Sequence, residues 1–238
     1  MENWLSRTEL LIGKEKLEIL SHAHVLVAGL GGVGGYAAEQ LCRAGVGELT
    51  LIDGDVVNPS NRNRQIIALV SNEGRSKAKA MASRFKDINP DIKLNIIDEY
   101  LKEERFASIL ARPFSYVVDA IDTLTPKVTL LAESVKNGHN IVSSMGSGGR
   151  LHPEKVEITD IADSHHCKFA HMVRKYLHRM GVYKGITVVY SPESVSQHTI
   201  KEISGEENKR SVVGTISYMP PVFGCFCASV VIRNLLSC

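Results

Sequence analysis

Short apolar runs and longer periodic stretches alternate along the chain. A continuous apolar run bounded by turn residues is typical of a strand buried on both faces of a parallel sheet. Apolar residues three and four apart indicate the helices between such runs. Strands are expected at residues 25–28, 49–52, 92–97, 116–122, 141–144, 156–161 and 185–190, and helices at 33–44, 77–89, 106–111, 125–137 and 223–236. This alternation predicts an α/β fold, with a mostly parallel sheet and helices on both faces.

A glycine-rich segment follows the first expected strand, Gly29-Leu30-Gly31-Gly32-Val33-Gly34, and a predicted helix follows it. In a Rossmann-like fold, a strand, a glycine turn and a helix in this order bind phosphate through backbone N–H groups and the positive helix end. Asp53 ends the second strand about twenty residues later, where a carboxylate can bind ribose hydroxyls. The segment therefore predicts a nucleotide site, without saying which nucleotide.

Aspartates end two of the expected strands. Asp53 follows the second strand, and Asp119 and Asp122 end the fourth. Open α/β sheets bind ligands beyond the carboxyl ends of their strands. A carboxylate that faces phosphates repels them unless a divalent cation lies between, so Asp53 and Asp122 predict a divalent-cation site. Asp119 is either a second ligand or a cap of the loop.

A polar segment beside the glycine loop carries a further cluster of candidates. Residues 58–65 include three asparagines and two arginines, and they form either a phosphate and base clamp or a plain surface loop. Lys77 opens the next helix, where its charge opposes the helix dipole. Such a misfit is expected if the ammonium serves a bound anion, and otherwise Lys77 is a solvated lysine.

A further helix is predicted within residues 165–185, and one of its faces carries charges of a single sign. No acidic residue lies between His165 and Lys184. A face of one sign indicates a polyanion surface or a membrane-surface helix, and the alternative is a solvated face. The spacing of His165, His166, Cys167 and His171 matches no standard metal site. The expected buried face carries Phe169, Met172, Val173, Tyr176, Leu177 and Met180, and the opposite face Lys168, His171, Arg174, Lys175, His178 and Arg179.

The ends of the chain carry less chemistry. A loose helical stripe with a break at Gly13 fills residues 1–22, and residues 197–209 predict a polar surface loop. The apolar stretch 212–231 is interrupted by glycines and prolines, so no transmembrane span is expected. We place Cys225 and Cys227 in the core of the last helix.

Composition narrows the classes of protein. The chain has 238 residues, 44% of them apolar, enough for a large core without staples. A net charge of +2 neither requires nor excludes nucleic acid. Five cysteines without framework spacing or Cys-x-x-Cys pairs, and no signal-peptide pattern, predict a reducing cytoplasm and no structural zinc.

Taken together, these motifs resemble the adenylating enzymes of the ubiquitin-activating type, the ThiF/MoeB/HesA superfamily. The resemblance rests on the glycine loop, Asp53-Gly54-Asp55, the segment 60–65, Lys77 and Asp119-Ala120-Ile121-Asp122. Further segments are similar to one branch, the tRNA threonylcarbamoyladenosine dehydratases, nearly end to end. They are residues 6–13, Pro126-Lys127, 146–150 and 217–224.

The resemblance implies roles for particular residues. In that family Asp122 binds magnesium, and Arg7 reaches the active site of the other subunit of a homodimer. The implied ATP-binding set is Gly29, Gly31, Gly32, Gly34, Asp53 (ribose), Asp55, and the phosphate residues Asn61, Arg64, Gln65 and Lys77. It also implies one adenylation domain, with a helical segment 1–22, a nucleotide-binding core 23–160 and a substrate and dimer part 161–238.

The implied reaction is ATP-dependent activation of a carboxylate. In the dehydratase branch this carboxylate belongs to the threonyl group of a modified adenosine in tRNA, which cyclises with loss of water. Cations must then stabilise the developing charge, and Arg7, Arg64, Lys77 and magnesium supply them. We expect tRNA phosphates to contact Lys168, Arg174, Lys175 and Arg179.

Two other functions compete. A sulfur-carrier activator would adenylate the C-terminal Gly-Gly of a ubiquitin-like protein, but its tail-binding groove would be apolar, not basic. A nicotinamide-dependent dehydrogenase or nucleotide sensor would need no triphosphate clamp such as Arg64 and Lys77. Sulfur-trafficking proteins are candidate partners in either adenylating case.

Overall fold

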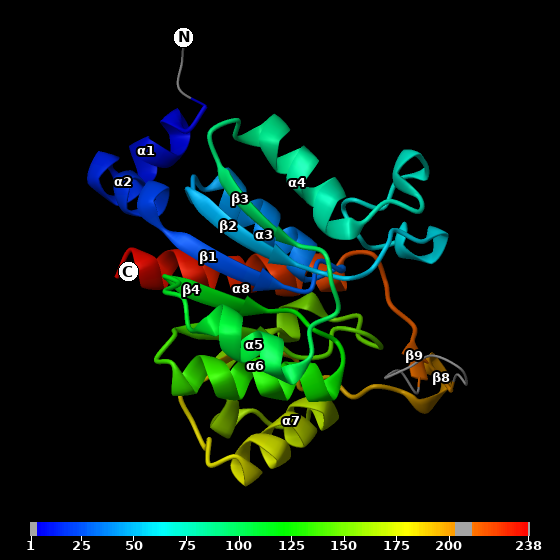
Figure 1. Cartoon of the computed structure of the whole chain (residues 1–238). Coiled ribbons are helices and arrows are strands. Elements are labelled where there is room, and N and C mark those ends of the chain that lie inside the picture. The colour runs from blue at the N-terminus through cyan, green and yellow to red at the C-terminus, as the bar shows by residue number, and fades with distance from the viewer. Residues whose placement is uncertain (1–3, 203–210, 238) are drawn as a thin grey trace.

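Seven strands form one sheet in the order β3-β2-β1-β4-β5-β7-β6 (Figure 1). The computed structural model describes residues 4–202 and 211–237. Neighbouring strands run parallel, except that β6 pairs antiparallel with β7 at one edge. The strands are β1 (His24–Ala28), β2 (Glu48–Ile52), β3 (Lys93–Ile97), β4 (Tyr116–Asp119), β5 (Ile141–Ser144), β6 (Glu157–Asp160) and β7 (Thr187–Tyr190). The predicted α/β fold with a mostly parallel sheet is confirmed.

Helices cover both faces of this sheet (Figure 1). α3 and α8 pack behind it, whereas α5, α6 and α7 lie on the other face. The helices are α1 (Ser6–Ile12), α2 (Lys14–His22), α3 (Gly34–Arg43), α4 (Lys77–Ile88), α5 (Glu103–Leu110), α6 (Leu124–Lys136), α7 (Lys168–Arg179) and α8 (Met219–Leu235). Short 3-10 turns include η1 (Pro59–Asn61), η4 (Ile161–Asp163) and η5 (Gln197–Thr199). β8 (Ile200–Glu202) pairs antiparallel with β9 (Ser211–Val213) in a separate two-stranded sheet.

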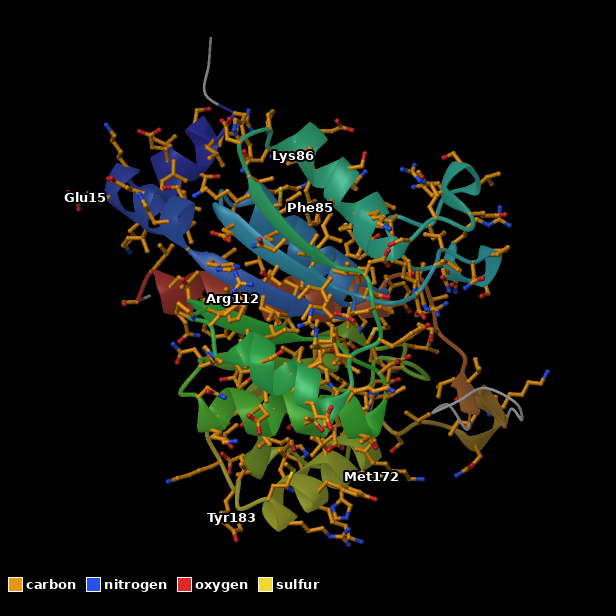
Figure 2. All side chains as sticks on the ribbon, in the orientation of Figure 1. Glu15, Phe85, Lys86, Arg112, Met172 and Tyr183 are labelled. Atoms are coloured by element: carbon orange, nitrogen blue, oxygen red, sulfur yellow. The ribbon has the colours of Figure 1, made fainter. Side chains whose placement is uncertain are left out.

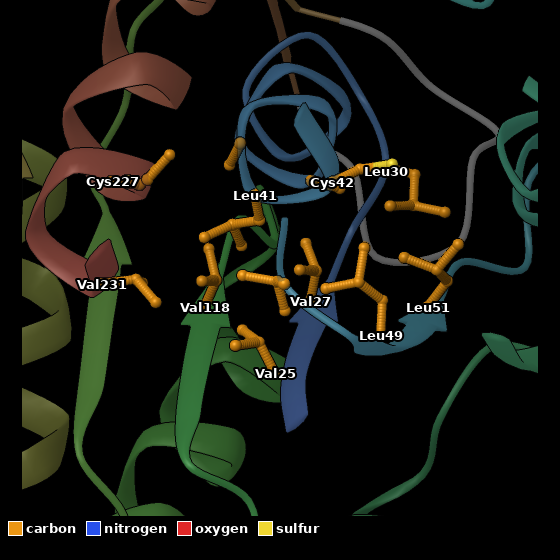
Figure 3. Packing of buried hydrophobic residues seen from close by; sticks show 14 of the residues in the cluster. Val25, Val27, Leu30, Leu41, Cys42, Leu49, Leu51, Val118, Cys227 and Val231 are labelled. Carbon is orange, nitrogen blue, oxygen red and sulfur yellow. The ribbon is translucent and has the colours of Figure 1, made fainter. Parts of the chain in front are cut away.

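Two hydrophobic cores form because side chains alternate along each strand. Val25 and Val27 of β1 join Leu49 and Leu51 of β2 in the core beneath α3 and α8, and Figure 3 shows this packing. Leu26 of β1 lies instead in the core beneath α5, α6 and α7. The continuous apolar run of β1 therefore reflects burial on both faces of the sheet.

The sheet order creates a switch point between β1 and β4. The chain passes from β1 outward to β2 and β3, then returns to β4 on the other side of β1. The connections after these two strands leave the sheet in opposite directions, which opens a crevice at their carboxyl ends. α8 supports this region, because Gly224 lies so close to α3 that a Cβ atom there would be 2.4 Å from the carbonyl oxygen of Val33.

The C-terminal helix differs from the prediction. α8 begins at Met219 rather than at 223, because Pro220 and Pro221 occupy its first turn, where a missing N–H is tolerated. Cys227 is buried as expected, but Cys225 is exposed, so its placement in the core was wrong. In the expected polar loop, residues 197–202 form η5 and β8, and residues 203–209 lie outside the described residues.

The orientation of α7 also differs from the prediction. Its buried side chains are Ala170, Val173 and Leu177, spaced three and four apart. Arg174 continues this inward stripe, because its Nη1 donates to the carbonyl oxygens of Ile161 and Ser164 at 3.0 and 2.9 Å and to Ser164 Oγ. The expected solvent-facing Arg174 is therefore wrong, and so is the expected burial of Met172, Tyr176 and Met180, which are exposed.

Within residues 4–202 and 211–237, no helix is both long and apolar enough to cross a bilayer.

Candidate functional site

The glycine loop lies at the carboxyl end of β1, and close packing explains three of its glycines. Gly29 has φ +86°, and a Cβ atom there would lie 2.7 Å from the carbonyl oxygen of Ala120. A Cβ atom on Gly34 would lie 1.7 Å from the carbonyl oxygen of Gly29, and one on Gly32 would lie 2.8 Å from Pro220 Cβ. Gly31 differs, because the only neighbour within 4 Å of such an atom is Gln65 Nε2, at 3.7 Å. Backbone at Gly31 is thus open to a ligand.

Asp53 joins two loops at the carboxyl end of β2. Its Oδ2 accepts a hydrogen bond from the N–H of Leu30 at 2.6 Å, and its Oδ1 accepts from the N–H of Asp55 at 2.8 Å. Burial raises the pKa of Asp53 above its ordinary value, although the positive charge of Lys77 opposes this shift. The carboxylate therefore fixes the glycine loop against the segment that carries Asp55.

Lys77 is nearly buried, with 4% of its surface exposed, and its Nζ lies 2.5 Å from Asp55 Oδ2. The hydroxyl of Tyr100 donates to the other carboxylate oxygen of Asp55, and this bond raises the pKa of Tyr100 to about 12. The solvated lysine considered as an alternative is ruled out by this burial. Asp55 compensates the ammonium in the structure, and a phosphate oxygen could take over that pairing.

The polar segment after β2 borders the glycine loop, with Gln65 beside Gly31 and Arg64 beside Gly32. Asn61 Oδ1 accepts from the N–H of Asn58 at 3.1 Å and closes η1. Gln65 is buried, and its Oε1 has no hydrogen-bond partner among the described residues. A bound ligand, or a water that it holds, would supply the missing hydrogen bond to this buried amide oxygen.

Arg64 and Asp122 lie close enough for their charges to interact. Arg64 Nη1 donates to the carbonyl oxygen of Ser60 at 3.0 Å and to Asn63 Oδ1 at 2.9 Å. Burial lowers the pKa of Arg64, and the negative charge of Asp122 opposes this shift. Asp122 is exposed in the loop between β4 and α6. The cations of Arg64 and Lys77 and the carboxylate of Asp122 therefore border one site.

Asp119 has a structural environment instead. It is fully buried, its Oδ2 pairs with the buried Nζ of Lys127, and Ser143 Oγ donates to the same oxygen at 2.5 Å. Lys127 Nζ also donates to Ser143 Oγ at 3.1 Å and to the carbonyl oxygen of Ser144 at 2.9 Å. The alternative of Asp119 as a magnesium ligand is thus wrong, because Oδ2 serves a core ion pair and Oδ1 caps the loop by accepting from the N–H of Ile121 at 3.0 Å. Among the described residues, no three His, Cys, Asp or Glu side chains gather as a metal site.

The remaining predicted residues lie away from the crevice. Arg7 is exposed on α1, which with α2 lies at the amino end of β1 (Figure 1). β1 has five residues, a length of about 16 Å, so Arg7 cannot serve the glycine loop of its own chain. α7 lies beyond α6, outside the nucleotide crevice, and carries Lys168, Lys175 and Arg179 on its exposed surface.

Two contacts of the site were missed by sequence reasoning. Tyr100 follows β3, whose carboxyl end lies at the same edge of the sheet as that of β2. Because open α/β sheets bind ligands at the carboxyl ends of their strands, the sequence could have suggested Tyr100 as a site residue. Thr215 was not recognisable, because its carbonyl oxygen accepts from Asn63 Nδ2 at 2.9 Å across a separation of 152 residues. The segment that leads into α8 therefore contacts the polar segment 58–65 of the candidate nucleotide site.

Known proteins share this architecture. The family model described as "ThiF family" matches residues 5–238. The chain belongs to the ThiF family. This ThiF-family chain is 36% identical over 243 residues to the tRNA threonylcarbamoyladenosine dehydratase of Bacillus subtilis, covering 99% of the chain and 96% of that relative. It is 38% identical over 195 residues to the enzyme of that name from Escherichia coli, covering 79% and 73%.

A solved structure agrees with this family assignment. The crystal structure of the Escherichia coli tRNA N6-threonylcarbamoyladenosine dehydratase, TcdA, in complex with ATP superimposes with a TM-score of 0.90 at 32% identity. The superposition covers 98% of the ThiF-family chain described here and 93% of the other. The whole fold, including α7 and α8, is therefore shared with that protein.

Proposed function

We propose that this ThiF-family protein is an ATP-dependent dehydratase that cyclises threonylcarbamoyladenosine in tRNA. The observation that carries the proposal is a group of charges beside the glycine loop. Arg64 lies against Gly32 and interacts with the charge of Asp122. Lys77 is buried next to Asp53, whose carboxylate accepts from the N–H of Leu30 in that loop. The similarity to dehydratases over nearly the whole chain selects the substrate. A ubiquitin-like carrier as substrate has no comparable support.

The residues present fit ATP. The open backbone at Gly31 can receive a phosphate oxygen, and the unpartnered Gln65 Oε1 can accept from a water bound to the ligand. Arg64 and Lys77 supply positive charge. Asp53 would hold the ribose through the lone pairs that its two backbone bonds leave over. Asn61 would keep its segment folded against the phosphates.

Magnesium fits Asp122. This ion commonly takes one or two carboxylates and completes its coordination with phosphate oxygens and water. One exposed carboxylate at the crevice is thus a sufficient protein contribution. When bound, the ion would neutralise charge on the phosphates.

The reaction has two steps. A carboxylate oxygen of the substrate attacks the α-phosphorus of ATP, and the bond to the β-phosphate breaks to release pyrophosphate. The ureido group of the same substrate then attacks the acyl carbon, AMP leaves, and the ring closes with net loss of water. Arg64 and Lys77 are fixed before the charge develops, so the first step needs little reorganisation.

A homodimer is part of the proposal. Leu10 and Leu11 of α1 are 89% and 85% exposed, and apolar side chains so exposed favour burial against a second copy. Arg7 lies on the same helix, and we propose that it serves the crevice of the partner. The tRNA would be held by Lys168, Lys175 and Arg179 of α7, and we place the reaction in the cytoplasm.

The test is mass spectrometry of tRNA nucleosides after incubation with the protein and ATP. We expect ATP-dependent conversion of threonylcarbamoyladenosine to a nucleoside lighter by one water, and none without ATP. Unchanged nucleosides, together with pyrophosphate exchange on a carrier protein that ends in Gly-Gly, would replace the dehydratase by the carrier-activating alternative.

A further inference from the structure

The outward face of α7 combines exposed apolar and aromatic side chains with cations. Met172, Tyr176, Met180 and Tyr183 are 45%, 41%, 52% and 62% exposed. Figure 2 shows Met172 on α7 and Tyr183 just beyond its C-terminal end, both along the outer margin of the molecule. The cations of this face are Lys168, Lys175 and Arg179. Solvation alone accounts for the charges but not for the neighbouring exposed rings.

The rings of this face already carry cationic or imidazole partners. The guanidinium carbon of Arg179 lies 5.1 Å from the ring centroid of Tyr176, and the rings of His178 and Tyr183 lie 5.1 Å apart. A guanidinium stacked on a ring widens a flat surface and keeps its N–H donors at the edge. Flat surfaces with donors beside them accept a nucleobase and its phosphate together.

The start of α7 lies at the same edge of the sheet as the crevice. Cys167, which precedes the helix, accepts a hydrogen bond at its Sγ from Arg150 Nη2 at 3.3 Å, and Arg150 belongs to the loop after the carboxyl end of β5. The 12 residues of α7 then extend for about 18 Å. Tyr176 and Arg179 therefore lie along a path that leads away from the nucleotide site.

We propose that this face of α7 stacks unpaired nucleotides of the bound tRNA, in addition to any phosphate contacts of its cations. The proposal rests on the proposed function for the identity of the RNA. Paired bases are stacked on each other and cannot use a tyrosine, whereas the splayed bases of a loop can. A membrane surface is a poorer match, because a membrane-binding helix inserts Trp, Phe and Leu, and this stripe has none of them.

The experiment separates ring stacking from charge. One variant, Tyr176→Leu with Tyr183→Leu, removes the rings but keeps apolar side chains, and a second, Tyr176→Phe with Tyr183→Phe, keeps the rings. Met172→Leu is the matched control on the same face. Each protein is titrated with tRNA that contains threonylcarbamoyladenosine, with a fully paired RNA duplex and with anionic phosphatidylglycerol vesicles, at several salt concentrations.

We expect the leucine variant to bind tRNA at least about 10-fold more weakly, with an unchanged salt slope, because stacking releases no counterions. The phenylalanine variant and Met172→Leu should bind like wild type, and the duplex should bind equally to all four. In the dehydratase reaction the leucine variant should raise KM and leave kcat unchanged.

Equal tRNA affinity of the leucine variant and wild type would overturn the proposal. So would a loss of vesicle binding with unchanged tRNA binding, which would mark the face as a membrane contact. A wild-type protein that binds tRNA through these rings but converts no nucleoside would instead contradict the proposed function, so the two failures are distinguishable.

Discussion

At the residue scale, two aspartates three positions apart have opposite environments. Asp122 is exposed beside Arg64, and Asp119 is buried against Lys127. We expect Asp122→Asn to fold normally and to lose at least about 100-fold in ATP-dependent turnover, because a contact that stabilises transition-state charge is removed. Turnover at saturating magnesium and the thermal midpoint are the two measurements. Near-normal turnover would remove Asp122 from the chemistry.

For the buried pair of Lys127 and Asp119 we expect a loss of stability. Lys127→Met leaves the carboxylate of Asp119 buried with only neutral partners, so the free energy of unfolding should fall by about 3–5 kcal/mol in a urea titration. The double variant Lys127→Met with Asp119→Asn removes both charges and should recover part of this loss. A double variant less stable than Lys127→Met alone would show that the pair does not act as a unit.

Sequence reasoning found which of these residues gather, but not what each one contacts. The glycine loop, Asp53 and Asp122 could be placed because strand ends share one edge of a parallel sheet. The sequence favoured Asp122 for the metal, but it could not separate a second ligand from a loop cap at Asp119. That separation depends on Lys127, which reaches back from α6 to the end of β4, a contact between side chains that no strand pattern encodes.

At the scale of elements, an ion-pair cluster joins α3 to α4. Glu39 is buried, and its carboxylate accepts from Arg84 at 2.6 and 2.9 Å and from Arg43 at 2.8 Å. Burial alone would raise the pKa of Glu39, but these bonds outweigh it and hold the pKa below its ordinary value.

This lowered pKa predicts a pH dependence of stability. The contribution of Glu39 is fully present above its unfolded pKa of about 4.3 and is lost as the pH falls through the lower, folded pKa. The difference in unfolding free energy between wild type and Glu39→Gln should thus shrink below about pH 4. Glu104→Gln, at an exposed position of α5, is the control. A difference that stays constant from pH 7 to 3 would contradict the assignment.

The cations of α7 divide into two groups. Arg174 bonds to η4 and Ser164, so Arg174→Gln should lower the unfolding free energy by about 1.5–3 kcal/mol. Lys168→Gln with Lys175→Gln should keep stability but weaken tRNA binding and flatten its log–log salt slope by roughly 0.7–0.9 per lost contact. Chemical unfolding and salt-dependent titration check the two effects. An unchanged slope would show that these two lysines are solvated and make no phosphate contact.

The helical period of α7 was recognisable, but its orientation was not. The apolar positions in the sequence span a wide stripe, so two different rotations of the helix about its axis would each bury apolar side chains. Packing on α6 buries the narrower stripe of Ala170, Val173 and Leu177, and the reach of Arg174 to η4 favours that rotation. Both observations depend on neighbours distant in sequence, so periodicity alone could not settle which rings face solvent.

At the scale of the whole molecule, fold class was readable from the sequence, whereas the order of the strands was not. The alternation of strands and helices predicts a parallel sheet, and right-handed crossovers place helices on both faces. The antiparallel pairing of β6 with β7 has no counterpart in the apolar pattern, because a short edge strand reads alike in either direction.

The position of Arg7 bears on the proposed assembly. α1 and the glycine loop lie at opposite ends of β1, so one chain cannot bring its own Arg7 to its own crevice. If Arg7 acts in the reaction, it does so in a second copy, and each active site then draws on two chains. A homodimer of Arg7→Ala chains should be inactive, because both of its sites lack the arginine. A homodimer of Asp122→Asn chains should be inactive too, because both of its sites lack the carboxylate that would bind the cation.

Mixed dimers test this arrangement directly. A dimer of one Arg7→Ala chain and one Asp122→Asn chain has one site that lacks both groups and one site that has both. Refolding an equimolar mixture should therefore recover about a quarter of wild-type turnover, since half of the dimers are mixed and half of their sites are intact. Differently tagged chains, purified in tandem, should give about half. Inactive mixed dimers of confirmed composition would show that Arg7 does not act in trans.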